Sequence, residues 1–186
     1  MTTSRICLSF PLALLCALAA PAVAAPVATV ATTTDQEITY HVFMGELAAD
    51  RGDAKTAVRE YLAATKLSSD PALASHTAIL AYGAADDASA LEAAHRWQAL
   101  APGNGDADQF VAVMDTRLGD VAGAAREFEA LARTAGGRSY TSDAEMLEQE
   151  SDAEHVLPVL TRIAQDEMQS ADAHFALAHA AMNYKQ

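Results

Sequence analysis

Apolar residues between positions 42 and 64 follow the spacing of two helix faces separated by a short polar turn. Residues 42–47 and 57–62 each place apolar side chains at helical intervals, which is typical of amphipathic helices. Gly52 suits the left-handed residue that ends a helix, and Asp53 suits the N-cap of the next helix. The pattern predicts two antiparallel helices joined by a tight turn.

The same pattern recurs along the chain, so its turn aspartates can be aligned. They are Asp53, Asp87, Asp120 and Asp152, at spacings of 34, 33 and 32 residues. A period in the low thirties is typical of stacked helix hairpins. The second turn lacks a glycine, and we expect it to be longer than the others. After the fourth repeat, residues 170–185 predict one further helix without a partner.

Other local signals predict where helices begin and where one is disturbed. Thr34 with Glu37, and Ser142 with Glu145, have the spacing of capping boxes. Pro158 falls inside the second helix of the fourth hairpin. Proline has no backbone N–H to donate, so we expect it to kink or delay that helix.

The first hairpin resembles a tetratricopeptide repeat. The family's pattern runs from a small residue to Gly-Asp, alanine, an aromatic residue and alanine. The matching positions are Gly45, Gly52, Asp53, Ala57, Tyr61 and Ala64. The third hairpin matches the later part of the pattern at Gly119, Asp120, Ala124 and Phe128. The family's usual first-helix tryptophan and tyrosine are absent, because His41 and Ala48 stand there.

This resemblance implies an all-α fold, a right-handed α-solenoid of stacked antiparallel helix hairpins over residues 36–186. It implies about four repeats plus an unpaired C-terminal helix. The composition agrees, because the chain is rich in alanine and only 6% aromatic, and alanine favours closely packed helices over a sheet. Trp97, the single tryptophan, is interpreted as the core aromatic residue of the second hairpin.

Residues 1–24 have the three parts of a secretory signal peptide. Arg5 supplies the positive start, residues 6–20 form the apolar segment, and residues 22–24 give a small-x-small cleavage site. We therefore expect an exported bacterial protein, periplasmic or associated with the envelope, with residues 25–35 as a linker. Cleavage would leave no transmembrane segment.

Both cysteines, Cys7 and Cys16, lie inside the predicted signal peptide. The mature chain would then have neither a disulfide nor a reactive thiol. Lipid attachment at Cys16 is disfavoured, because lipoprotein signals place a small residue before the cysteine and Leu15 stands there.

The chain has more acidic than basic residues, and this excess limits the classes of partner that it can bind. Its 186 residues carry a net charge of −13, and loss of Arg5 would make this one unit more negative. An acidic surface repels nucleic acid and anionic lipid, so neither is an expected partner. The charge could steer a basic partner, although solvation of the helix faces explains it more simply.

The sequence has no motif of catalysis or metal binding. His174 and His179 are five residues apart, which places them about 140° apart on a helix. Residues 104–115 resemble a calcium loop in part, but Gln109 stands where that loop needs glycine, and helix capping explains the acids better. We expect no catalytic residue, no metal site and no cofactor, and hence no enzyme.

In tetratricopeptide repeat proteins, the first helix of each hairpin lines a concave groove that takes a peptide or a partner helix. Carrying these positions over gives the groove residues Val42, Glu46, His76, Gln109 and Val113. Tyr82 is the alternative to His76, because the register of the second repeat is open. The basic residues with which some family members grip a C-terminal carboxylate are missing. An extended or helical segment, partly apolar, is therefore the expected ligand.

The resulting hypothesis is an envelope scaffold or adaptor that binds a protein or peptide in its concave groove. By analogy, an envelope protease or an assembly protein is suggested as the partner. Two alternatives stay open. One is a truncated structural fragment that homodimerises through its uncapped last helix, and the other is a non-catalytic accessory domain of an envelope enzyme.

Overall fold

The computed structural model describes residues 33–134 and 137–185, and within these ranges the protein has nine helices and no strand. The predicted signal peptide and most of the predicted linker lie outside the described residues. The helices are α1 (Thr34–Asp50), α2 (Ala54–Leu67), α3 (Pro71–Gly83), α4 (Asp87–Leu100), α5 (Gly105–Leu118), α6 (Val121–Ala132), α7 (Tyr140–Glu150), α8 (Ala153–Asp166) and α9 (Ala171–Asn183). The expected all-α fold is confirmed.

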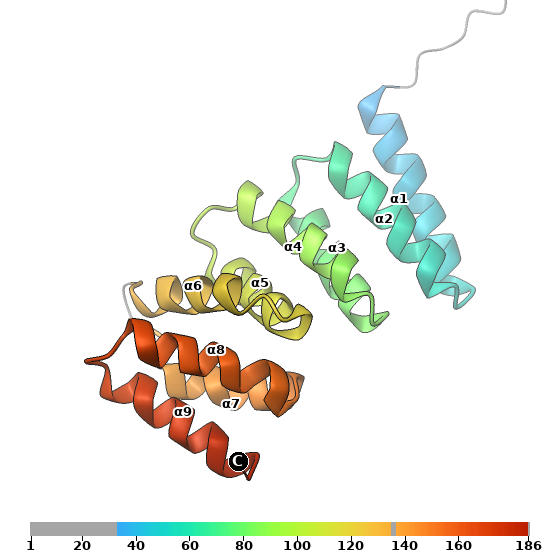
Figure 1. Cartoon of the computed structure of the whole chain (residues 1–186). Helices are drawn as coiled ribbons and strands as arrows, with labels where there is room; N and C mark the ends of the chain where they lie inside the picture. Colours follow the sequence, from blue (N-terminus) through green and yellow to red (C-terminus); the bar gives the residue numbers. More distant parts are fainter. Residues whose placement is uncertain (1–32, 135–136, 186) are drawn as a thin grey trace, which may run out of the picture. The chain divides into compact units, whose positions relative to one another are not determined.

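Neighbouring helices pack as hairpins, and each hairpin packs on the next (Figure 1). The closest pairs are α1 with α2, α3 with α4, and α5 with α6. Contacts of α2 with α3 and of α4 with α5 join the first three hairpins. The last three helices are arranged differently, since α7 contacts α9 more extensively than α8, while α8 packs between α6 and α9. This packing is consistent with a helical repeat.

The turns of the first three hairpins share one backbone geometry. The residue before each capping aspartate has a positive φ, +74° at Gly52, +56° at Ala85 and +78° at Gly119. The next N–H then reaches back to the carbonyl five residues earlier, as from Asp53 to Ala48 over 2.9 Å. This is the Schellman closure of a helix. Alanine therefore takes the left-handed position that glycine takes in the other two turns.

The aspartate after each left-handed residue caps the second helix of its hairpin. Asp53 accepts a hydrogen bond from the Thr56 N–H, Asp86 from Ser89 and Asp120 from Gly123, over 3.1, 3.1 and 2.9 Å. The cap of the second hairpin is therefore Asp86, so the predicted alignment on Asp87 was wrong by one residue. The second turn is also no longer than the first, because Ala85 closes it as Gly52 closes the first turn.

Alignment on Asp86 makes the second hairpin a closer copy of its neighbours. Ala57, Ala90 and Ala124 each follow a capping aspartate by four residues, and all three are fully buried. The place held by the buried aromatic side chains of Tyr61 and Phe128 is occupied in the second hairpin by alanine, Ala94.

Two other local predictions differ from the structure, and the expected delay of α8 at Pro158 is not seen. Helix α1 is capped by Thr33 with Gln36 in a capping box, one residue earlier than predicted. Ser139, rather than Ser142, caps α7, because the helix begins at Tyr140. Helix α8 runs through Pro158 without interruption. The fourth turn also lacks the shared geometry, since the side chain of Asp152 makes no capping hydrogen bond.

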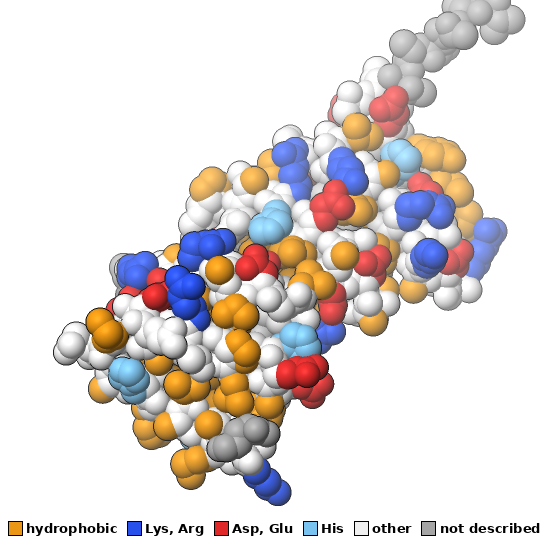
Figure 2. All heavy atoms as spheres, viewed as in Figure 1, with side chains coloured by type: hydrophobic (Ala, Val, Ile, Leu, Met, Phe, Trp, Pro, Cys, Tyr) orange, Lys and Arg blue, Asp and Glu red, His pale blue; other side chains and the backbone are white. Residues whose placement is uncertain are grey.

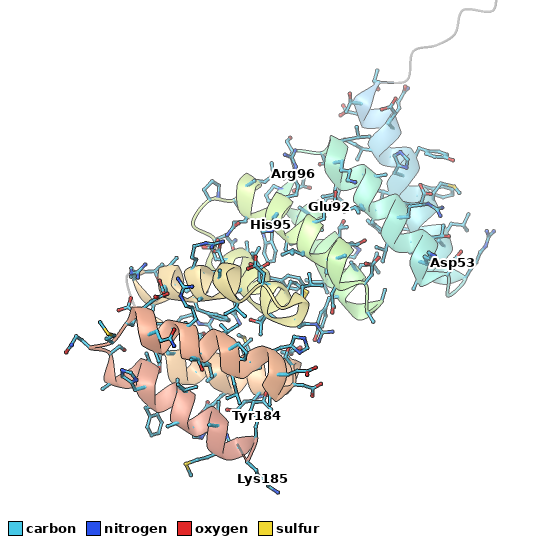
Figure 3. The ribbon with its side chains drawn as sticks, viewed as in Figure 1. Asp53, Glu92, His95, Arg96, Tyr184 and Lys185 are labelled. Carbon is cyan, nitrogen blue, oxygen red and sulfur yellow. The ribbon has the colours of Figure 1, made fainter. Side chains whose placement is uncertain are left out.

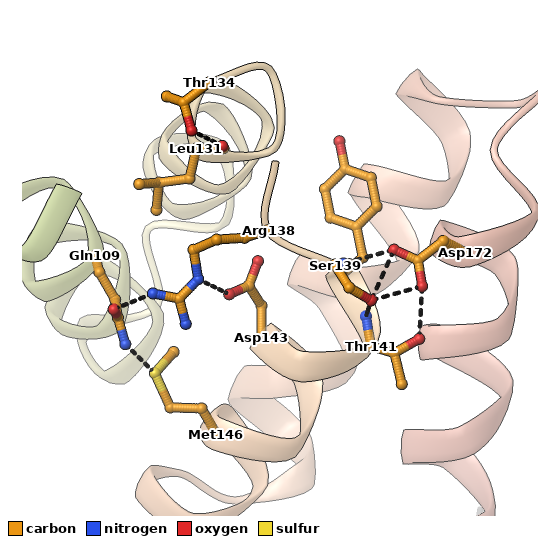
Figure 4. Close-up of polar contacts among 10 residues, drawn as sticks. Gln109, Leu131, Thr134, Arg138, Ser139, Thr141, Asp143, Met146 and Asp172 are labelled. Atoms are coloured by element: carbon orange, nitrogen blue, oxygen red, sulfur yellow. Dashed lines mark hydrogen bonds and ion pairs between the residues drawn. The ribbon is translucent and has the colours of Figure 1, made fainter. Parts of the chain in front are cut away.

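Helix α9 is anchored to α7 at both of its ends. The Asp172 carboxylate accepts hydrogen bonds from the hydroxyls of Ser139 and Thr141 and from the N–H of Tyr140, which is a donor at the start of α7 (Figure 4). Burial acts to raise the pKa of Asp172, but these hydrogen bonds outweigh it and lower that pKa. At the other end, the Tyr184 hydroxyl donates to the Ser151 carbonyl over 2.7 Å (Figure 3).

The first hairpin depends on a close approach between Gly45 and Tyr61. A Cβ placed on Gly45 would lie 2.7 Å from Cδ2 of Tyr61. We expect Gly45→Ala to lower the free energy of unfolding by about 1–3 kcal/mol, because the buried ring has no room to shift. Chemical denaturation of both proteins measures this difference.

Gly83→Ala is the matched control for this substitution. A Cβ added at Gly83, the last residue of α3, meets no atom within 4 Å. This change should leave stability unchanged or raise it by about 0.5 kcal/mol, since alanine favours the helix. Equal losses for both variants would contradict the close packing of Gly45 on Tyr61.

Candidate functional site

A mostly apolar pocket of about 280 Å³ opens along helix α5, between α3, α4 and α7. We call it the α5 pocket. Its lining residues are Ile79, Tyr82, Trp97, Asp106, Gln109, Phe110, Val113, Met114, Met146 and Glu150. A concave, mainly apolar site with a few polar groups at its edges is typical of ligand-binding pockets.

Three aromatic side chains form one wall of the α5 pocket. The Phe110 ring centroid lies 6.1 Å from that of Tyr82 and 6.3 Å from that of Trp97, in edge and tilted arrangements. Trp97 is only half-buried, and Ile79 beside it is 57% exposed. The interpretation of Trp97 as the hairpin's core aromatic residue is therefore wrong, because its ring faces the pocket.

Arg117 closes one end of the α5 pocket by joining three helices. Its guanidinium lies 3.1 Å from the Asp87 carboxylate, donates to the Glu150 carbonyl over 2.8 Å, and stands 5.3 Å from the centroid of the Tyr82 ring. The Tyr82 hydroxyl donates to the Glu150 carboxylate. The hydrogen bond from Arg117 to Asp87 is the main cause that raises the pKa of Arg117. The hydrogen bond from the Tyr82 hydroxyl to the Glu150 carboxylate is the main cause that raises the pKa of Tyr82.

Arg138 makes a similar bridge at the other end of the pocket (Figure 4). It donates to the side-chain carbonyl of Gln109, whose amide group contacts the Met146 sulfur. Its Nε lies 3.0 Å from Oδ1 of Asp143, which is 1% exposed. Burial raises the pKa of the Asp143 carboxyl to about 6, although the Arg138 charge acts in the opposite direction.

The α5 pocket includes part of the predicted groove set. Gln109 and Val113 line it, and so does Tyr82, the alternative to His76. His76 instead packs on the Tyr61 ring, with centroids 4.9 Å apart. The assignment of these residues to a partner remains a prediction.

Two other predicted groove residues, Val42 and Glu46, belong to α1 and lie outside the α5 pocket. Glu46 accepts a hydrogen bond from the Tyr61 hydroxyl. Burial of Tyr61, with this contact to Glu46, raises the Tyr61 pKa to about 12. Glu46 is thus already engaged within the first hairpin.

Several lining residues of the α5 pocket were not predicted from the sequence, among them Ile79, Phe110 and Met146. Ile79 and Tyr82 are three residues apart and therefore lie on one helix face, so this spacing could have predicted Ile79. No sequence pattern could have predicted Met146, because its place in the pocket depends on how α7 packs beside α5.

The opposite side of the helix stack carries mixed charges. Figure 2 shows basic, acidic and histidine side chains interspersed over this face, with no area of one sign. Lys66 pairs with Glu92 over 2.8 Å, and Arg96 donates to the Ser68 carbonyl over 2.7 Å (Figure 3). These contacts fix neighbouring helices and leave the α5 pocket as the stronger candidate site.

Residues 33–134 and 137–185 contain no group of three His, Cys, Asp or Glu side chains that could hold a metal ion. His174 contacts the Met168 carbonyl, and His179 lies 3.6 Å from the Glu148 carboxylate. None of the helices in the same residues is long and apolar enough to span a bilayer.

The buried Asp143 predicts a specific pH dependence of stability. Its pKa is about 6 in the folded chain against an ordinary 3.8, so the folded state binds the proton more tightly than the unfolded state. Stability should therefore fall as the pH rises from about 4 through 6, by at most about 3 kcal/mol for this group. Asp143→Asn, which cannot ionise, should be more stable than the wild type at pH 7.5 and equal to it near pH 4.

Thermal unfolding at several pH values measures this difference, and Asp152→Asn on the surface is the control. Burial and the neighbouring Asp120 also raise the pKa of Asp115 to about 6. The Asp143→Asn variant should therefore keep some pH dependence of stability, which comes from Asp115. Parallel curves for the wild type and Asp143→Asn would contradict the proposed cost of ionising Asp143.

No protein-family model matches the chain, and no match was found among curated proteins. The resemblance of residues 45–64 to a tetratricopeptide repeat therefore remains a prediction, while the packing of helix hairpins stands on the structure itself.

Proposed function

We propose that this chain is an interaction scaffold without catalytic activity that holds a segment of another protein in the α5 pocket. The observation that supports this most is the aromatic wall of Tyr82, Trp97 and Phe110 beside the exposed Ile79. Large apolar side chains in a concave pocket are the groups that contribute most to protein binding.

The bridges at the two ends of the pocket support a preformed site. Arg117 links α5 to α4 and α7, and Arg138 links Gln109 on α5 to the start of α7. These contacts hold the helices that carry the lining at a fixed spacing. A preformed pocket loses less conformational entropy on binding, which favours affinity.

The wider proposal is an exported scaffold or adaptor of the bacterial envelope. We place the groove on a right-handed α-solenoid of about four tetratricopeptide-like repeats with an unpaired last helix. This rests on the repeated turn geometry at Asp53, Asp86 and Asp120 and on the signal-like pattern of residues 1–24. An envelope protease or an assembly protein is the class of partner proposed.

A photocrosslinking amino acid at Ile79 tests this function in the native cells. Ile79 is exposed beside the aromatic wall, so a partner seated in the α5 pocket should be captured there. The same probe at Ala122, exposed on α6, is the control. Adducts with a specific protein from Ile79 alone are expected. No adduct from Ile79, or the same adducts from both positions, would contradict the proposal.

Self-association is a second candidate function, favoured by the surface near α9. Phe175 and Met182 are 59% and 76% exposed, and Met168 before the helix is 71% exposed. Phe175 stacks on His179, with centroids 6.0 Å apart. Apolar side chains at helical spacing, exposed together, are typical of an interface between molecules.

Sedimentation equilibrium over a range of concentrations tests this second candidate. A homodimer through α9 should dissociate on dilution, and Phe175→Glu with Met182→Glu should shift it to monomer because charges would be buried. Phe43→Glu, on the similarly exposed face of α1, should leave it unchanged. A wild-type chain that is monomeric at every concentration would rule this candidate out.

A further inference from the structure

The lining of the α5 pocket has an uneven charge. Among its described lining residues, Asp106 and Glu150 are acidic and none is basic. Asp106 is exposed, its backbone N–H donates to the capping Asn104, and its carboxylate has no hydrogen-bond or ion-pair partner within residues 33–134 and 137–185. Glu150 accepts from the Tyr82 hydroxyl through one carboxylate oxygen. The pocket therefore offers negative charge beside its apolar wall.

The two cations at the ends of the pocket pair with other carboxylates, and Arg117 also interacts with the charge of Glu150. Arg117 is paired with Asp87 over 3.1 Å, and Arg138 is paired with the buried Asp143 over 3.0 Å. Each guanidinium is thus balanced by a carboxylate that does not line the pocket. Asp106 and Glu150 remain as the acidic groups available to a ligand.

The two carboxylates lie at opposite ends of the pocket. Arg138, just before α7, reaches Gln109 near the start of α5, whereas Arg117, near the end of α5, reaches the carbonyl of Glu150 at the end of α7. Helices α5 and α7 therefore run parallel, with their starts adjacent. Asp106 is at the start of α5, and Glu150, the last residue of α7, is beside the end of α5.

The distance between these ends follows from the geometry of α5. Eleven residues separate Asp106 from Arg117, which corresponds to about 16 Å along the helix axis. An extended peptide covers about 3.3 Å per residue. The two acidic ends are thus about five residues apart on an extended ligand, with the apolar wall of Trp97, Phe110 and Val113 between them.

We propose that the α5 pocket selects an extended basic segment, with a large apolar side chain between two Lys or Arg residues about five positions apart. The proposal rests on the scaffold function above and names the class of its partner. The apolar anchor fills the pocket beside Ile79 and Trp97. The two cations pair with Asp106 and Glu150, so binding weakens as the salt concentration rises.

Fluorescence anisotropy of labelled peptides on the full chain tests this selection. The probe is Lys-Ala-Phe-Leu-Ala-Lys, and the comparison peptides are Glu-Ala-Phe-Leu-Ala-Glu, Lys-Ala-Ser-Ser-Ala-Lys and Lys-Lys-Ala-Phe-Leu-Ala. We expect the acidic and the serine peptides to bind at least tenfold more weakly than the probe. The peptide with adjacent lysines should bind about threefold more weakly, because only one cation reaches its carboxylate.

Variants of the chain show which residues of the α5 pocket are responsible for the peptide preference. The double variant Asp106→Asn with Glu150→Gln should bind the probe about tenfold more weakly than the wild type. It should also lose the preference for the probe over the acidic peptide. Asp50→Asn, an exposed acid on α1, is the matched control for loss of charge and should change nothing. Ile79→Ser should weaken every peptide that binds, whereas Phe43→Ser on the exposed face of α1 should not. Circular dichroism checks that each variant keeps its helices.

The outcomes separate this proposal from the scaffold function. Equal binding of the basic and acidic peptides, both weakened by Ile79→Ser, would overturn the charge selection and leave the pocket as a binding site. Probe binding that Ile79→Ser does not change would place the site elsewhere and overturn both. If no peptide binds, the selection is wrong, and the crosslinking from Ile79 decides the scaffold function on its own.

Discussion

Close packing between helices through small side chains is the constraint on which the rest of this structure depends. Ala57, Ala90 and Ala124 are fully buried at one equivalent place in three hairpins, and Gly45 lets the Tyr61 ring approach the α1 backbone. Small side chains at a crossing allow two backbones to approach closely, but they provide little core volume. The first three hairpins therefore need the left-handed turn and the capping aspartate to fix their geometry as well.

The second hairpin shows how this constraint is connected to the candidate site. Tyr61 and Phe128 fill the aromatic place of the first and third hairpins, whereas Ala94 occupies it in the second. The large side chain of α4 is Trp97 instead, and it lies in the wall of the α5 pocket against Phe110. An aromatic ring that would otherwise fill a hairpin core is thus available to a ligand.

The sequence was sufficient for part of the local geometry. Gly52 with Asp53 predicted the first turn and its cap, because the left-handed conformation and the side-chain acceptor are local properties. The cap at Asp86 was missed because two aspartates stand side by side and an alanine takes the place of glycine. In the candidate site, Gln109 and Val113 were found by position in the repeat. Trp97 and Met146 were not, because their places depend on contacts between separate hairpins.

The α5 pocket is the proposed binding place of a partner segment, and Trp97 reports on it directly. As the single tryptophan of the chain, it gives an emission signal from the pocket wall without a label. Titration with unlabelled Lys-Ala-Phe-Leu-Ala-Lys should shift this emission to saturation, at the concentrations where the labelled peptide binds, because burial of the indole changes its surroundings. Binding of the labelled peptide with an unchanged Trp97 emission would contradict the account.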